Sequence, residues 1–241
     1  MAIQRYFEGI GSINSDNPIG MLPYLDPTKW CVWMEDFVNV PELTSQWTHN
    51  AIDGIVSVDS TGGTSSLVQA LGGTHATDND YSQLYPTVTV GNFTFASGKK
   101  LIFEAKVMVT AAGTIGLQEL FVGLGTVQAT NNFIDALGLL LTVDNCVGFW
   151  SPDATATIKC VSRVADVESI QSAATTYATA TQMVLSFYFD GTTVAFYKND
   201  VQIGHLFTYP TAGVTPVLWI KCGEAQIISL KTDYILVARE R

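Results

Sequence analysis

Apolar and polar residues alternate along much of the chain, and the clearest case is the run 183–189. Every second residue of this run is large and apolar, which is the pattern of a strand with one face in a core. An Asp-Gly dipeptide follows at 190–191 and tolerates the positive φ angles of a tight hairpin turn. A second apolar run at 193–197 and a second turn at 198–200 lead into residues 201–204. The pattern predicts a meander of three antiparallel strands.

Further strands are expected where apolar runs are bounded by turn residues. Helical periodicity is nearly absent, and its one candidate, 166–174, is rich in Ala and Ser and could equally be a loop. Many strands with short turns predict two packed antiparallel sheets, an all-β sandwich. The further expected strands are 55–58, 87–95, 101–109, 120–124, 138–143, 147–150, 157–164, 217–222 and 227–238.

Residues 1–34 lack a regular pattern, because glycine, proline and asparagine interrupt them repeatedly. They also carry large apolar side chains, which a purely flexible tail would lack. We therefore expect an extended N-terminal arm at 1–34 and one sandwich domain at 35–241. The arm needs a surface to lie on, either its own sandwich or a neighbouring subunit. The candidate partner-binding residues are Met21, Leu22, Tyr24, Leu25 and Trp30.

The composition limits the classes of partner. The chain has 241 residues, of which 14% are charged and 47% hydrophobic, and its formal net charge is −10. A surface with so few charges favours partial coverage by other proteins. Negative charge and scattered basic residues argue against nucleic-acid binding, which needs clustered lysine and arginine. The most apolar run, 136–143, is far shorter than the ~20 residues of a membrane span, and no secretory signal is recognisable, so we expect a cytoplasmic product that binds no membrane.

No constellation of catalytic or metal-binding residues stands out. The three histidines, His49, His75 and His205, lie in separate segments without ligand spacing. Nucleophile-elbow, phosphate-loop and dinucleotide motifs are absent. We therefore expect no catalytic residue, no metal and no cofactor. The four cysteines are expected to be buried thiols, with a disulfide between Cys146 and Cys160 as an alternative.

Paired carboxylates decide whether a sandwich of this kind is a glycosidase, because the acid and the nucleophile must flank one bond. The acidic pair at 35–36 is adjacent, so its side chains would point to opposite faces of a strand. Asp166 and Glu168 have the required spacing but fall in the segment that is either helix or loop. Asp78 and Asp80 lie in an expected loop, which is either solvated or a calcium site. We therefore predict a protein that is not an enzyme.

Three tryptophans bear on sugar binding, which uses exposed aromatic rings beside polar loops. Trp150 ends an apolar strand and Trp219 lies within an alternating one, so we expect both in the core. Trp47 lies between polar residues and is expected to be exposed on a loop. One exposed tryptophan does not make a sugar-binding platform.

The predicted meander resembles the central hairpin of concanavalin A-like lectin and glucanase (laminin-G-like) jelly rolls. The resemblance covers 35–241 in matching order and implies an antiparallel jelly-roll β-sandwich. The Glu-x-Asp-x-x-Glu and Glu-x-Asp-x-Glu strands of the glucanase members are absent, and the metal-and-sugar loop of the lectins is not recognisable. The resemblance therefore carries over neither hydrolysis nor sugar binding. Its residues lie at 35–37, 98–105, 188–204, 215–220 and 232–238.

Two terminal segments resemble phage-encoded structural proteins. They are residues 23–30 before the sandwich and residues 237–241 at its end. The resemblance implies a bacteriophage capsid decoration (cement) protein on the virion surface, assembled in the host bacterial cytoplasm. Its partner would be the major capsid protein or another virion protein, and it would form a homotrimer or a homodimer. The alternatives are a carbohydrate-binding module of a tail or fibre component and an unrecognised glycosidase.

Overall fold

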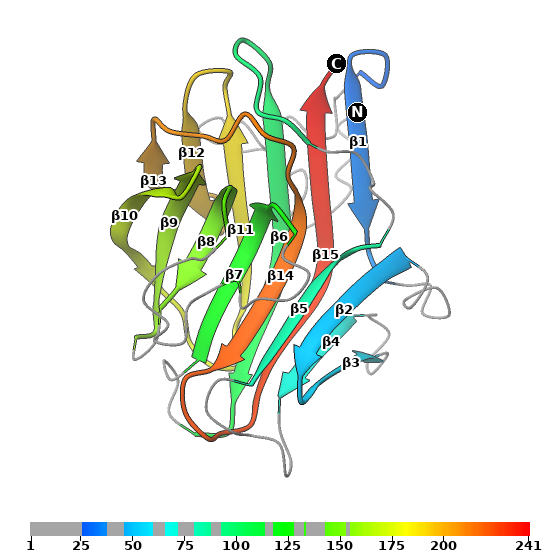
Figure 1. Ribbon diagram of the computed structural model, residues 1–241, viewed down its shortest axis with the longest axis vertical. Coiled ribbons are helices and arrows are strands. Elements are labelled where there is room, and N and C mark those ends of the chain that lie inside the picture. The colour runs from blue at the N-terminus through cyan, green and yellow to red at the C-terminus, as the bar shows by residue number, and fades with distance from the viewer. Residues whose placement is uncertain are drawn as a thin grey trace, which may run out of the picture.

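The computed structural model describes residues 26–37, 46–59, 66–71, 80–87, 93–113, 118–127, 133, 143–152 and 155–241. These residues form two antiparallel sheets, which lie one behind the other in Figure 1 and confirm the predicted all-β sandwich. Sheet A has the order β13 (Val201–Leu206), β12 (Val194–Lys198), β11 (Gln182–Phe189), β6 (Leu101–Ala111), β15 (Ile228–Glu240), β4 (Ser66–Leu71) and β3 (Gly54–Asp59), and β1 (Trp30–Glu35) also pairs with β15. Sheet B has the order β10 (Val167–Thr176), β9 (Thr157–Val164), β8 (Cys146–Ser151), β7 (Gln118–Gly125), β14 (Thr215–Cys222), β5 (Tyr81–Pro86) and β2 (Trp47–Ile52).

The predicted meander is present as β11, β12 and β13. The Asp190 carboxylate holds the first turn, because it accepts hydrogen bonds from the backbone N–H groups of Thr192 and Thr193 at 2.7 and 2.8 Å. Slight burial opposes ionisation of Asp190, but these bonds and those from the two threonine hydroxyls outweigh it and hold its pKa at about 2. The second turn has φ of 48° at Asn199 and 66° at Asp200, the geometry of a two-residue loop that matches the twist of its strands.

Alternate side chains of both sheets meet in a core of phenylalanine rings. Phe103 and Phe187 of sheet A stack with ring centroids 5.0 Å apart. Phe149 of sheet B meets Phe196 of sheet A edge-on, with centroids 5.5 Å apart. Such ring pairs each add about 0.5–1.5 kcal/mol beyond the burial of their area. The rings therefore join β8 of sheet B to the meander of sheet A.

The first described strand, β1, lies at the end of the expected arm. It pairs with β15 in a register that runs from Trp30 opposite Glu240 to Glu35 opposite Ile235. Trp33 packs against the core between the sheets. The chain therefore lies on its own sandwich from Trp30 onward, and the expected boundary between 34 and 35 falls inside a strand.

Most of the other expected strands are confirmed, because β3, β6, β7, β8, β9, β14 and β15 coincide with seven of them. The strand expected at 87–95 is displaced: β5 ends at Pro86, and Phe93 makes only an isolated bridge to Val214. Residues 88–92 and 138–142 lie outside the described ranges, so the strand expected at 138–143 is described only at Val143. Strands β2, β4 and β5 have no counterpart in the sequence-based expectation.

The helix or loop expected at 166–174 is wrong. Residues 167–176 form β10, which pairs antiparallel with β9. A two-residue turn at Ala165 and Asp166, with φ of 46° and 70°, starts this hairpin. Ile170 then packs against apolar residues on the outer face of sheet B. Strand pairing and this packing therefore override the local preference of an alanine-rich segment.

A buried carboxyl group lies on the outer face of sheet A. Glu104 of β6 is 1% exposed and accepts a hydrogen bond from the Tyr234 hydroxyl at 2.7 Å. Burial raises the pKa of Glu104 to about 7; the bond from Tyr234 opposes this shift and the charge of Asp200 adds to it. Ser186 lies directly opposite Glu104 in the strand register, and its buried hydroxyl has no hydrogen-bond partner.

Glu104→Gln should change how stability depends on pH. The native state holds the Glu104 proton up to about pH 7, whereas the unfolded chain releases it near 4.5. The group therefore stabilises the fold below about pH 4.5 and loses that contribution as the pH rises to about 7. We expect the free energy of unfolding of the variant, relative to the parent, to rise by about 3 kcal/mol between about pH 4 and pH 8. Urea unfolding at the two pH values measures this, with Ser186→Ala as a non-titrating control; a pH-independent difference for Glu104→Gln contradicts it.

Candidate functional site

Of the five candidate partner-binding residues, the structure describes only Trp30. Met21, Leu22, Tyr24 and Leu25 lie outside the described residues. Trp30 is half-buried on β1, where it packs against an apolar cluster on the outer face of sheet A. Within the described residues, Trp30 is therefore part of a sheet and not of a separate arm. The cluster consists of Ile102, Tyr197, Tyr234, Leu236 and Ala238.

The outer face of sheet B carries a row of aromatic and polar side chains that crosses its strands from β2 to β9. Strand pairing places the members of this row directly opposite one another. Opposed residues of antiparallel strands point to the same face, so the row shares one surface. We call this set the outer row: Asn50, Gln83, Trp219, Phe121, Trp150 and Lys159, in order across the sheet.

The middle of the outer row is closed to water, and its two ends are not. The four middle residues are at most 1% exposed, although they face away from the core between the sheets. Phe133 contributes to their cover, since its ring centroid lies 4.5 Å from that of Phe121. Asn50 and Lys159, at the two ends, are half-buried. Asn50 and Lys159 are therefore the members of the row that are partly open to solvent.

Four buried polar atoms of the outer row have no hydrogen-bond partner. They are the amide oxygen and nitrogen of Gln83 and the indole nitrogens of Trp150 and Trp219. Such atoms are rare in folded proteins, and each one costs about 1–3 kcal/mol. Both tryptophans are buried, as the sequence predicts, but they lie on the outer face and not between the sheets. The row therefore offers one acceptor atom and three donor nitrogens.

Two glycines allow the Phe121 ring to lie close to the sheet. Gly123 of β7 and Gly148 of β8 are directly opposed. A Cβ atom at Gly123 would lie 2.4 Å from a backbone oxygen, and one at Gly148 would lie 2.6 Å from another. The Phe121 ring would come within 3.1 and 2.9 Å of these two Cβ positions. Close approach of backbone and ring therefore requires glycine at both positions.

A buried ion pair borders the outer row. Lys221 Nζ lies 3.1 Å from each carboxylate oxygen of Glu119, and the two side chains are 0% and 1% exposed. Glu119 precedes Phe121 by two residues and Lys221 follows Trp219 by two, so both charges share the face of the row. Tyr81, opposite Lys221, stacks on Trp219 with ring centroids 6.5 Å apart. Charge and aromatic surface are thus adjacent on this face.

The β2 end of the outer row is polar and partly open. The Asn50 amide donates a hydrogen bond to the Tyr85 hydroxyl at 3.2 Å. The Thr48 hydroxyl donates to that of Thr87 at 2.9 Å. Thr48, Asn50 and Tyr85 are each half-buried. One ring beside several hydrogen-bonding groups suits a ligand rich in hydroxyls.

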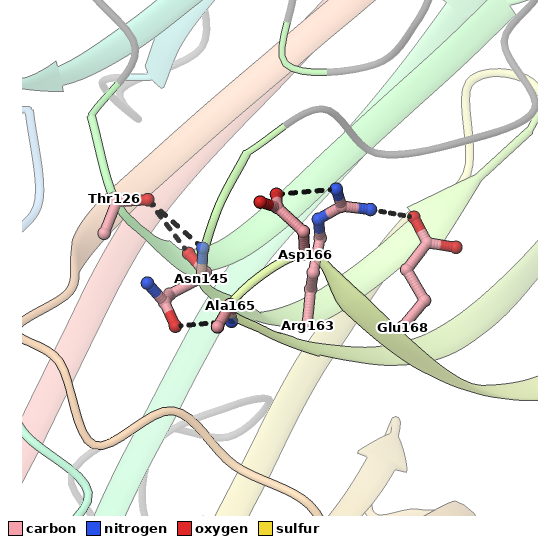
Figure 2. Close-up of polar contacts among 6 residues, drawn as sticks. All are labelled: Thr126, Asn145, Arg163, Ala165, Asp166 and Glu168. Atoms are coloured by element: carbon pink, nitrogen blue, oxygen red, sulfur yellow. Dashed lines mark hydrogen bonds and ion pairs between the residues drawn. The ribbon is translucent and has the colours of Figure 1, made fainter.

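An arginine fixes the β9–β10 hairpin at another edge of this face (Figure 2). The Arg163 guanidinium donates hydrogen bonds to Glu168 and Asp166 at 2.9 Å each. The Asn145 side-chain oxygen accepts a hydrogen bond from the N–H of Ala165 at 3.2 Å. Since Ala165 has a positive φ, which alanine rarely adopts, these bonds stabilise an unfavourable turn. The two acids with glycosidase-like spacing therefore both bind one arginine.

The described strands of sheet B point two carboxylates to the outer face, those of Glu119 and Glu168. Glu168 shares a cross-strand row with Gly125 of β7, which is six residues beyond Glu119 on the same strand. Six residues at ~3.3 Å along the strand and three strand spacings of ~4.8 Å across the sheet place the two positions roughly 24 Å apart. An acid pair that cleaves a glycosidic bond spans about 5–10 Å. Glu119 and Glu168 therefore do not form such a pair.

The histidines and the expected metal loop are only partly within the described residues. His49 Nε2 lies 2.9 Å from the Ser82 hydroxyl, and His75 and Asp78 lie outside the described residues. Asp80 is buried, at 4% exposure. Over the described ranges, no group of three or more His, Cys, Asp and Glu side chains is placed to hold a metal ion. The described residues also contain no helix that is long and apolar enough to cross a membrane.

Trp47 and the cysteines also have defined positions. The prediction that Trp47 is exposed on a loop is wrong, because it lies in β2, is 5% exposed and contacts Phe37 with ring centroids 5.5 Å apart. β2 pairs antiparallel with β5, and the Trp47 side chain packs in the core between the sheets. All four cysteines are free thiols, and the alternative disulfide is not formed. Cys31 is exposed, which differs from the expectation of four buried thiols. The other three are buried, as expected.

Comparison with known proteins bears on the fold. No protein-family model matches the chain, and no curated protein matches it. Solved structures do match. An endo-1,3-β-glucanase from Streptomyces sioyaensis is 11% identical, with 89% of this chain and 98% of that chain covered and a TM-score of 0.58. A glycoside hydrolase family 16 endo-glucanase from Bacteroides ovatus is 12% identical, with 84% and 98% covered and a TM-score of 0.57. The carbohydrate recognition domain of Emp47p is 8% identical, with 88% and 98% covered and a TM-score of 0.56.

The fold is a concanavalin A-like jelly roll. At these identities the likeness shows the fold alone. None of the three structures is a capsid protein, so the capsid-decoration interpretation of this jelly roll gains no support. The prediction that the chain is not an enzyme was wrong, because two of the structures that share its fold are endo-glucanases. The jelly roll therefore gives no ground for excluding catalysis.

Lys221→Met should strongly destabilise the jelly roll. The substitution leaves the Glu119 carboxylate buried without its cation, and breaking a buried ion pair in this way lowers the free energy of unfolding by about 3–5 kcal/mol. Adding Glu119→Leu removes the stranded charge, so the double variant should recover most of the loss. Urea unfolding of both single variants and the double variant measures this. A double variant less stable than Lys221→Met contradicts the assignment of the pair.

Proposed function

We propose that this jelly roll binds a glycan along the outer face of sheet B. The observation that carries the proposal is the set of four buried polar atoms without partners on Gln83, Trp150 and Trp219. Sugar hydroxyls both donate and accept hydrogen bonds, so they can pair with both atoms of the Gln83 amide and with the indole N–H groups. Such pairing removes the free-energy penalty that these atoms impose on the unliganded protein.

An elongated ligand fits the shape of the outer row. The row crosses five strand spacings between Asn50 and Lys159, which is about 24 Å. Its open ends are half-buried polar residues, and its closed middle is aromatic. At the β2 end, the half-buried ring of Tyr85 lies beside the Asn50 amide, so a sugar there would meet an apolar surface and a hydrogen-bonding group together. An oligosaccharide has the length to span the two ends and the hydroxyl groups to pair with the middle, and its binding there requires the cover over the middle residues to open.

The names of the similar structures agree with this ligand class. Two of them are glucanases, and the third is a carbohydrate recognition domain. Carbohydrate binding is also the alternative that the sequence left open. The virion location, the capsid-protein partner and the homo-oligomeric state stay predictions, because nothing in the described residues or in the three named structures bears on them.

Gln83→Met should weaken glycan binding without weakening the fold. Methionine has a similar shape and no hydrogen-bonding group, so the variant loses the proposed contacts while an unpaired buried amide disappears. We expect affinity to fall at least about tenfold, and the free energy of unfolding to stay level or rise by about 1 kcal/mol. Binding is measured on an array of β-glucan, galactan and uronan hexasaccharides, followed by calorimetry with the strongest binder. An assay for released reducing ends measures whether the bound glycan is hydrolysed.

Ser186→Ala is the matched control for Gln83→Met. It also removes a buried polar group without a partner, but on the outer face of sheet A. It should leave glycan affinity unchanged. Equal affinity of Gln83→Met and the parent, or an array without any binding, overturns the proposed function.

A further inference from the structure

We propose that the β9 end of the outer row binds the anionic group of an acidic glycan, a carboxylate or a sulfate. This inference rests on the proposed function and names the ligand class more closely. It assigns a role to Lys159 and to the indole N–H of Trp150, two groups that the fold does not otherwise pair through hydrogen bonds or ion pairs.

Lys159 is held in place without a counter-ion. It lies directly opposite Trp150 in the strand register, and its Nζ is 5.1 Å from the centroid of the Trp150 ring. Among the described residues, no carboxylate forms an ion pair with it. The ring therefore positions the ammonium group, and its charge remains available at a half-buried site.

Among the described residues, the acids on this face do not neutralise this charge. The two carboxylates that the strands of sheet B point to this face are already engaged, Glu119 with Lys221 and Glu168 with Arg163. Glu119 is two strands and two residues away from Lys159, or about 12 Å by strand geometry. That distance exceeds the ~8 Å over which exposed charges interact at physiological salt.

Other lysines on the strands show how unusual this arrangement is. The chain has 22 acidic and 12 basic residues, so carboxylates are in excess. Of the four other lysines on the described strands, three have a carboxylate within 3.1 Å, and Lys198 donates to the backbone oxygen of Thr176. Lys159 has an aromatic ring instead. These three pairs are Lys106 with Asp233, Lys221 with Glu119, and Lys231 with Asp59.

The groups at this end are all donors. Lys159 Nζ offers three N–H bonds, and the unpartnered Trp150 Nε1 offers one from the same ring that positions the lysine. A neutral hydroxyl can accept hydrogen bonds from them but supplies no charge to balance the ammonium group. An anionic group supplies several acceptor oxygens and a compensating charge, so it can satisfy both. Lysine acts as a point charge and does not select planar geometry, so carboxylate and sulfate are both accommodated.

The test compares acidic and neutral hexasaccharides of the same length on the full chain. Calorimetry is run with a polyuronate, a sulfated galactan and an unsubstituted β-glucan on the parent, Lys159→Met and Lys159→Arg. Methionine keeps an apolar stem over Trp150 without the charge, and arginine keeps the charge. We expect Lys159→Met to lose about tenfold in affinity for the acidic ligand and Lys159→Arg to retain most of that affinity. Affinity for the neutral ligand should be unchanged in both variants.

The dependence of affinity on salt concentration gives a second readout. Affinity of the parent for the acidic hexasaccharide should fall as salt rises, and Lys159→Met should remove this dependence. The polyuronate and sulfate arms decide which anion is preferred, and preference for either supports the inference. Neutral glycans that bind as tightly as acidic ones, with Lys159→Met affecting neither, overturn the inference and leave the proposed function standing. Absence of binding to all three overturns both.

Discussion

The middle strands of sheet B are shut off from water on both faces, and much of the chemistry of this protein follows from that constraint. Strand β7 is buried along its whole length, and so is β8, although alternate residues of each point away from the core. Any polar group on the outer face must therefore find a partner inside the protein or in a ligand. Glu119 and Lys221 find each other. The Gln83 amide and two indole nitrogens find nothing, and they make up four of the twelve buried side-chain polar atoms without a hydrogen-bond partner among the described residues.

The two outer faces meet this constraint differently. On sheet A, the buried Glu104 carboxyl takes a hydrogen bond from Tyr234 and keeps its proton to a higher pH than an exposed acid. That solution is internal, although the buried Ser186 hydroxyl opposite Glu104 has no partner. On sheet B, the unsatisfied atoms form a line between two half-buried ends. The contrast is the reason for placing ligand binding on sheet B and a structural role on Glu104.

The sequence predicted the sandwich well where strands alternate strictly and end at strong turn residues, as in the meander around Asp190. It failed where pairing partners decide the outcome, because an alanine-rich segment became β10 through its hairpin with β9. The outer row was out of reach for the same reason. Its members come from six strands scattered from Asn50 to Trp219, and only the register across them brings them together. One local signal was present: Trp219 and Lys221 are two residues apart, so a charge had to share the face of a tryptophan assigned to the core.

The opposed glycines beneath Phe121 have a consequence for tracing relatives of this chain. Overall identity to proteins of the same fold is 8–12% in the three named structures, too low to align site residues with assurance. Gly123 and Gly148 admit no larger residue without moving backbone, and Phe121 occupies the space above them. Divergent descendants that keep this packing must retain both glycines and a flat ring two positions before the first. That short fingerprint, found on adjacent strands, would mark common ancestry where whole-chain similarity has faded.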